Sequence, residues 1–207
     1  MYRQSRGKQV VEEFCGEDGL KFNGVLISDF YAAYNTYTGF HQRCWVHLLR
    51  DIKELKQLYR KHPPLNIWAK RVHLIYTEAK TYIGAEGRLP IGLAQQERID
   101  RQHEFEHRLE TVCQPYLAKE SPMSTLSGRI VNFLPELFTF IRFPNVPSDN
   151  NPAERILRHT VIARKIQGGT RSSRGSQTKA VLTSLFNTWL LQGKDPLTEC
   201  RLLLASS

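Results

Sequence analysis

Residues 24–29 read GVLISD, a short uninterrupted apolar run that begins at a glycine and ends at an acid. A run of this length between turn signals predicts a strand buried in a parallel sheet rather than an edge strand. The carboxyl ends of such strands border the crevice in which α/β folds hold their chemistry, so Asp29 is a candidate functional acid. A second interpretation is that Asp29 only caps the turn into residues 30–34, and the local sequence leaves both open.

The chain around this run predicts a second strand and two helices. Residues 41–45 read HQRCW and form the second candidate strand, which leads into an amphipathic helix that ends before Pro63. Upstream, within residues 1–20, Val10, Val11 and Phe14 have the spacing of one amphipathic helix that ends near Gly16. The apolar face of the helix after the second strand consists of Leu48, Ile52, Leu55 and either Leu58 or Tyr59.

From residue 65 to residue 141 the apolar pattern is helical throughout. Three apolar stripes follow one another, and breaks that contain glycine or proline separate them. The stripes run over residues 68–82, 105–116 and 130–141. Residues 95–107 are polar and are expected to form an exposed helix. We therefore expect an α/β fold in which residues 1–62 and 144–207 form the core and residues 63–143 form a mostly helical insertion.

The positive charge of the chain is concentrated near its end. The 207 residues have a formal charge of +9, and residues 142–179 alone contain eight Lys or Arg residues and two acids. Such a concentration predicts a polyanionic partner, most often nucleic acid, although a solvated basic face is the alternative. Residues 168–175 read GGTRSSRG and predict a basic loop whose backbone can approach a phosphate. The candidate DNA-binding residues are Arg155, Arg158, Arg164, Lys165, Arg171 and Arg174.

Residues 149–155 read DNNPAER and predict a helix start just before the most basic segment. Asn151 suits the N-cap, Pro152 the first helical position and Glu154 the third, which together form a capping-box pattern. Glu154 therefore either serves the cap or is a functional carboxylate. Together with Asp29 it suits phosphoryl transfer at DNA, in which distant acids hold two divalent cations. The expected cofactor is Mg²⁺ or Mn²⁺, because such cations prefer carboxylate, water and phosphate oxygens.

The cysteines and histidines predict neither a disulfide framework nor a complete zinc site. The four cysteines are scattered without a CxxC pair, as expected for reduced thiols in a cytoplasmic protein. Cys44 and His47 form a Cys-x-x-His pair without further ligands, so a buried cysteine beside a hydrogen-bonded histidine is the alternative. His103 and His107 also lack a third ligand. No apolar run approaches the roughly 20 residues that span a bilayer, and the N-terminus has no signal-peptide pattern, so we expect no membrane partner.

Three ordered blocks of this sequence resemble the IS66-type insertion-sequence transposases. The blocks are residues 24–35, 42–51 and 149–155. The resemblance covers nearly the whole chain and implies an RNase H-like catalytic domain of the DDE type, which cuts and joins DNA with Mg²⁺ or Mn²⁺. In the family's pattern Asp29 matches the second metal-binding acid and Glu154 the third. Cys44 and His47 match a Cys-x-x-His signature of several transposase families, so we expect a structural role for them near the active site.

The first acid of that pattern belongs to a block that would precede residue 1, and no acid before Asp29 is a plausible substitute. We therefore expect an incomplete RNase H-like core without its leading strands, which binds DNA but cuts it poorly alone. Its exposed strand edge favours association with partners, including a second copy of the chain. The alternatives are a non-catalytic DNA-binding protein that uses residues 142–179 and an unrelated α/β protein in which Glu154 is only a cap. The resemblance implies a bacterial-type cytoplasmic location, on the nucleoid when DNA is bound.

Overall fold

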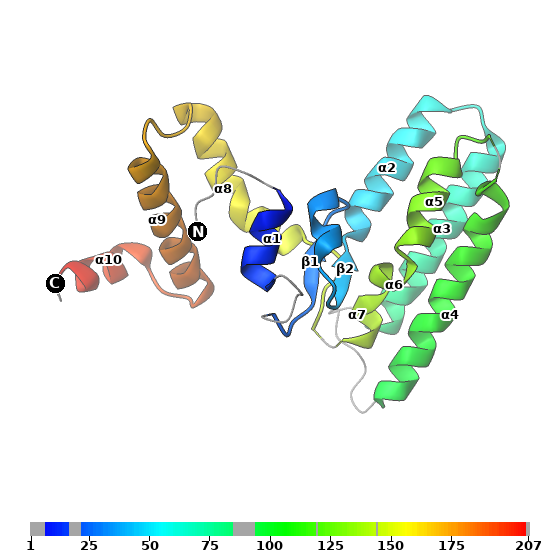
Figure 1. The fold of residues 1–207 in the computed structure, drawn as a ribbon, viewed down its shortest axis with the longest axis horizontal. Coiled ribbons are helices and arrows are strands. Elements are labelled where there is room, and N and C mark those ends of the chain that lie inside the picture. Colours follow the sequence, from blue (N-terminus) through cyan, green and yellow to red (C-terminus); the bar gives the residue numbers. More distant parts are fainter. Residues whose placement is uncertain (1–6, 17–21, 85–93, 119, 144, 206–207) are drawn as a thin grey trace. The chain divides into compact units, whose positions relative to one another are not determined.

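The computed structural model describes residues 7–16, 22–84, 94–118, 120–143 and 145–205. Their contacts divide the chain into two compact units, a larger unit of residues 7–150 and a C-terminal unit that begins at Asn151 (Figure 1). The described residues are mostly helical and contain two short strands. None of the described helices is long and apolar enough to cross a membrane. The expected boundaries at residues 62 and 143 stay predictions.

The larger unit begins with a helix and a parallel pair of strands. Helix α1 (Lys8–Cys15) comes first in the sequence, followed by strand β1 (Leu26–Ser28). The short 3-10 helix η1 (Ala32–Thr36) is part of the connection from β1 to strand β2 (His41–Arg43). The two strands pair in parallel, with Ser28 opposite Arg43 at their carboxyl ends. Since parallel strands end at the same edge, the residues that follow β1 and β2 lie next to one another.

The predicted strands are confirmed in type and direction but are shorter than expected. The structure has strands within residues 24–28 and 41–45, and the first helix ends before Gly16 as predicted. The expected full burial of the first strand is wrong for Leu26 and Ile27, which are half-buried. In the described part of the chain β1 has a strand partner on one side only, which leaves its other side less covered.

The predicted helical insertion is confirmed as helical, with two corrections. Residues 95–107 and the second apolar stripe form one helix, whose buried face includes Gln102 and Phe105. The third stripe forms three short helices, because the backbone leaves helical geometry at Phe133 and Phe138 and Pro135 has no N–H to donate. The helices are α2 (Trp45–Leu58), α3 (Pro63–Tyr82), α4 (Gln95–Cys113), η2 (Gln114–Tyr116), α5 (Ser124–Asn132), α6 (Leu134–Leu137) and α7 (Thr139–Arg142).

The hydrophobic core of the larger unit lies among α2 to α7. Trp45, the first residue of α2, stacks on Tyr76 with 4.6 Å between ring centroids and packs against Phe138 at 5.4 Å. Trp45, Trp68 and Phe138 are fully buried. Burial of each large apolar side chain contributes about 2 to 3 kcal/mol. The sheet is therefore anchored to the helices through the residue that directly follows Cys44.

Side chains and helix ends cover the second edge of β2. The Thr139 hydroxyl donates to the His41 carbonyl at 2.7 Å, and the Phe140 N–H donates to Gln42 Oε1 at 2.8 Å. Gln42 Nε2 donates in turn to the Leu137 carbonyl at 3.1 Å. The His41 carbonyl, which could otherwise bind a neighbouring strand, is thus satisfied by α7. The Gln42 side chain joins β2 to α6 and α7.

Arg43 is fully buried at the end of β2. Its Nε donates to Glu136 Oε2 at 2.6 Å, its Nη2 to Asn35 Oδ1 at 2.7 Å and its Nη1 to the Asp29 carbonyl at 2.9 Å. The guanidinium carbon lies 4.5 Å from the centre of the Phe133 ring. One buried cation therefore joins the end of β1, η1, β2 and α6.

His41 is buried beside this cation and is neutral at pH 7. Its Nδ1 lies 3.1 Å from Glu136 Oε2, and its Nε2 lies 2.7 Å from Ser28 Oγ. Burial, together with the charge of Arg43, lowers the pKa of His41 to about 3. A neutral ring has a single N–H, which donates to the Glu136 carboxylate, so the Ser28 hydroxyl donates to Nε2.

The C-terminal unit consists, in its described residues, of helices α8 (Asn151–Gln167), α9 (Ser173–Leu191) and α10 (Pro196–Ala205). The predicted helix start is wrong by one residue, since Asn151 is already helical. Residues 160–165 belong to the same helix. The predicted basic loop is shorter than expected, because Ser172 Oγ accepts from the Gly175 N–H at 3.1 Å and starts α9 there.

The helices of the C-terminal unit do not form a hydrophobic core among their described residues. Ser176 is the buried residue of this unit, and large apolar side chains on all three helices are exposed. Examples are Ile166 on α8, Leu191 on α9 and Leu204 on α10. Apolar exposure of this extent is typical of a surface that meets another surface. The expected association with partners stays a prediction.

The first testable prediction concerns the buried ion pair. Replacement of Glu136 by Gln leaves the Arg43 charge buried without its anion, and we expect the free energy of unfolding to fall by about 3 kcal/mol. Urea unfolding measures this change. The control is Glu78→Gln, which removes the exposed partner of Arg108 and should cost about 1 kcal/mol or less. Equal losses in the two variants would contradict the role assigned to Arg43.

The second prediction concerns pH. Between about pH 6.5 and pH 3 the unfolded chain binds a proton at His41 that the native state does not bind, so stability decreases as the pH falls. From pH 7.5 to pH 5 this group alone should lower the free energy of unfolding by about 2 kcal/mol. The measurement is urea unfolding at both pH values for the wild type and His41→Gln. The variant should lose less stability than the wild type; the same loss in both would show that His41 is not the group responsible.

Candidate functional site

Asp29 follows the last residue of β1 and is half-buried. Its Oδ1 accepts a hydrogen bond from the Tyr31 N–H at 3.0 Å, so the turn-capping interpretation of this residue is correct. That contact uses one carboxylate oxygen, and in the described residues the structure shows no hydrogen bond to Oδ2. Its main-chain carbonyl is held by Arg43 at 2.9 Å. The backbone of Asp29 is therefore fixed while part of its carboxylate can bind a ligand.

The carboxyl ends of both strands meet the segment that precedes α8. The Cys44 N–H donates to the Ser28 carbonyl at 2.8 Å, which places the residue after β2 beside the end of β1. The Trp45 N–H donates to the Ser148 carbonyl at 3.0 Å, and the Asn150 N–H approaches Cys44 Sγ at 3.4 Å. All of these residues belong to the larger unit. Chain segments about 100 residues apart are thus joined at Cys44.

Cys44 contributes to this junction as a buried thiol. Burial raises its pKa, although the N–H groups of Asn150, His47 and Val46 oppose the rise. The side chain is therefore a neutral thiol at pH 7. All four cysteines are free, and among the described residues no three His, Cys, Asp or Glu side chains are grouped as metal ligands. The geometry gives Cys44 a structural contact, while His47 is half-buried in the first turn of α2.

Glu154 lies in the first turn of α8 and is half-buried. It belongs to the C-terminal unit, whereas Asp29 belongs to the larger unit, and the structure does not place the two units relative to one another. The pairing of Asp29 with Glu154, and the binding of Mg²⁺ or Mn²⁺ between them, stay predictions.

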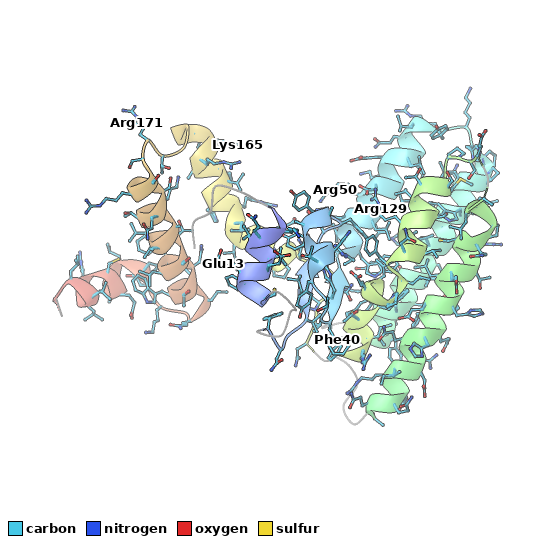
Figure 2. The ribbon with its side chains drawn as sticks, in the orientation of Figure 1. Glu13, Phe40, Arg50, Arg129, Lys165 and Arg171 are labelled. Carbon is cyan, nitrogen blue, oxygen red and sulfur yellow. The ribbon has the colours of Figure 1, made fainter. Side chains whose placement is uncertain are left out.

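The predicted DNA-binding residues are all exposed in the C-terminal unit. Figure 2 shows Lys165 near the end of α8 and Arg171 on the loop that follows. On α8 the cations are not confined to one face, since Arg158 and Lys165 are two turns apart on one side and Arg164 points elsewhere. The α8 cations are Arg155, Arg158, Arg164 and Lys165, and Arg174 lies in the first turn of α9.

The loop between α8 and α9 brings cations and hydrogen-bond donors together. Gly168 and Gly169 have φ values of 67° and 94°, a backbone geometry that favours glycine and allows the sharp turn. A hollow of about 570 Å³ at the start of α9 is lined by Ser172, Arg174 and Lys179, among others. Hydroxyl and cationic side chains at the start of a helix suit contact with a phosphate.

The sequence analysis missed the side chains that hold Asp29 in place. His41 and Arg43 lie in the candidate strand 41–45 without a predicted role, and Glu136 lies within residues 130–141, also without one. A charged residue within a strand that is otherwise buried is the signal that could have identified Arg43, because a buried cation requires a partner. Its partner lies 93 residues away, so the sequence offers no local sign of it.

Comparison with known families supports the sequence resemblance. A family model described as "Transposase IS66 family" matches residues 1–178, which is most of the chain. The match includes Asp29, Cys44, His47, Glu154 and all six candidate DNA-binding cations. Searches of curated proteins and of solved structures found no match. On the strength of the family match, this chain belongs to the IS66 family of transposases.

Proposed function

We propose that this chain acts in DNA transposition by metal-dependent cleavage and joining of DNA strands. Asp29 and Glu154 are two acids of a DDE-type site, and the larger unit contributes strands of an RNase H-like core. Membership in a transposase family supports DNA as the partner. The observation that carries the site proposal is the junction of the ends of β1 and β2 with residues 148–150.

The chain itself limits how far Glu154 can be from this junction. Asn150 is bound to Cys44, and Cys44 is bound to Ser28, the neighbour of Asp29. Glu154 follows Asn150 by four residues, so their Cα atoms are at most about 14 Å apart even in an extended chain. A helical chain is shorter, with a rise of about 6 Å over four residues. The proposal is that these two acids, 125 residues apart in sequence, bind a common ligand.

The donor groups fit a hard divalent cation. Asp29 has a carboxylate oxygen beyond the one that caps its turn, and Glu154 adds a second carboxylate. Mg²⁺ typically binds one or two carboxylates, with water and substrate phosphate as the remaining ligands. When bound, such cations activate the attacking oxygen and stabilise the leaving oxygen of a phosphodiester. In this arrangement Arg43 binds the main-chain carbonyl of Asp29. Cys44 binds the N–H of Asn150 and so holds the segment before α8 next to the end of β2.

The cations of the C-terminal unit hold the DNA backbone in this proposal. Arg and Lys side chains bind phosphates of any sequence, and each contact releases counterions, so the affinity decreases with salt. The exposed cations on α8, on the loop after it and at the start of α9 follow Glu154 directly in the chain. DNA held by them is delivered to the neighbourhood of that carboxylate.

The third prediction tests the acid pair. We expect Mn²⁺ to bind the protein, measured by the electron paramagnetic resonance signal of free Mn²⁺, and expect Asp29→Asn or Glu154→Gln to weaken binding about 10-fold or more. Asp100→Asn, at an exposed acid of α4, is the control and should change nothing. Residues 1–207 supply two of the three acids that the resemblance implies, so we expect only weak DNA nicking with Mg²⁺ or Mn²⁺. Strong nicking that both substitutions leave intact would refute the site assignment.

A second candidate function is that of a DNA-binding protein without catalysis, because the exposed cations alone suffice for it. The fourth prediction tests the DNA contact that both candidates share, whereas the Mn²⁺ measurement of the third prediction separates them. Glu substitutions at Arg164, Lys165, Arg171 and Arg174 should strongly weaken binding to a duplex, measured by fluorescence anisotropy at several salt concentrations. Asp29→Asn and Glu154→Gln should leave that binding unchanged. Loss of DNA binding without loss of Mn²⁺ binding in the charge-reversed variant supports both the DNA contact of these cations and the separate metal site. Unchanged DNA binding would exclude this surface as the DNA contact.

A further inference from the structure

A second basic surface lies on the larger unit, in a part of the chain to which the proposed function assigns no role. A hollow of about 920 Å³ lies between α2 and α3. Residues 50–73, which contain much of its lining, include seven Lys or Arg residues and two acids. The concentration of positive charge is similar to that of residues 142–179, but it is divided between two helices and is less evident in the sequence.

Four cationic side chains line the hollow. Lys53 and Lys56 lie on α2, Arg60 follows the end of that helix, and Lys70 lies on α3. Within the described part of the chain none of the four forms an ion pair with an acid. Four like charges around one hollow repel one another, so a bound anion would stabilise the arrangement.

The acids nearest to this hollow are mostly engaged elsewhere. Asp51 on α2 forms an ion pair with Arg129 of α5, and Glu78 on α3 forms one with Arg108 of α4. Glu54 is the remaining acid of this part of α2, and it does not line the hollow. The charge of the four cations is therefore not neutralised by the helices that hold them.

The polar side chains of the hollow suit a sugar–phosphate backbone. Lys70, His73 and Thr77 are spaced three and four residues apart and share one face of α3, and Gln57 faces them from the end of α2. Thr77 Oγ1 donates to the His73 carbonyl at 2.9 Å and lies 3.3 Å from His73 Nδ1. Amide, hydroxyl and imidazole groups beside cations are the side chains that bind phosphate and sugar oxygens.

The floor of the hollow argues against a protein helix as the occupant. Ile52 and Ala69 are only 4% and 5% exposed and belong to the core, and Leu49 of the lining is half-buried. Leu74 is the exposed aliphatic residue of the lining, at 55%. An amphipathic helix needs a row of apolar contacts along its groove, whereas a phosphate backbone needs cations and donors.

We propose that the α2–α3 hollow is a second DNA-binding site, in which Lys53, Lys56, Arg60 and Lys70 hold the phosphodiester backbone. The site belongs to the larger unit and adds to the contacts of the C-terminal unit. It rests on the proposed function in one respect, since DNA is the polyanion that a transposase encounters. Two basic surfaces on separate units allow one chain to hold two stretches of DNA backbone.

The test compares two triple variants of the full chain that remove the same charge. The groove variant carries Lys53→Gln, Lys56→Gln and Lys70→Gln, and the control carries Arg50→Gln, Arg71→Gln and Lys80→Gln, none of which lines the hollow. Binding to a 30-base-pair duplex is measured by fluorescence anisotropy over a series of salt concentrations. We expect the groove variant to bind about 10-fold more weakly and its slope of log affinity against log salt to decrease by about 2 to 3. The control should change the slope by less than about 1.

Three results would overturn the proposal, and they are distinguishable. If the groove variant and the control bind DNA equally well, the hollow does not hold DNA, while the proposed function stands. If the wild type binds no DNA, the proposed function fails together with this site. If an acidic helical peptide binds to the wild type but not to the groove variant, and DNA binding is the same in both, the occupant is a protein segment. Circular dichroism checks that the variants remain folded.

Discussion

The ion pair between the buried Arg43 and the half-buried Glu136 is the interaction on which the larger unit depends. It joins the end of β2 to α6, and the same guanidinium binds the carbonyl of Asp29. A buried cation is tolerated only when its hydrogen bonds are satisfied, and such geometry fixes the parts of the chain that supply them. The position of the candidate acid therefore depends on a residue 107 positions later in the sequence. The helices of residues 63–142 therefore help to hold Asp29 in place.

The sequence predicted those parts of the fold that rest on local patterns. The parallel strand before Asp29, the helix after Cys44 and the long helix from Pro63 follow from apolar periodicity and chain breaks, which act over a few residues. Apolar periodicity does not predict the division of residues 130–141 into three helices, because α6 and α7 depend on contacts with β2, about 95 residues earlier in the chain, as well as on Pro135. The network around Arg43 was missed for the same reason, because its partners lie far apart in the chain.

The sequence identifies the candidate residues of the site, whereas most of the contacts among them are seen only in the structure. Asp29 was expected either to cap a turn or to bind a cation, and the observed cap leaves one oxygen for the second role. Cys44 and His47 stand out in the sequence as a motif. Only the structure shows that the Cys44 thiol accepts a hydrogen bond from the N–H of Asn150, the residue before α8. The cations that follow Glu154 were evident from charge counting, whereas the α2–α3 cations were not, because the fold brings them together from two helices.

We propose that Asp29 and Glu154 share a divalent cation. A crystal structure of the full chain grown with Mn²⁺, with the ion located by its anomalous scattering, tests this most directly. The account predicts an Mn²⁺ peak with carboxylate oxygens of both residues at about 2.1 Å, or bridged to one of them through water. A structure in which Mn²⁺ binds elsewhere, with the two carboxylates too far apart to share an ion, would contradict it.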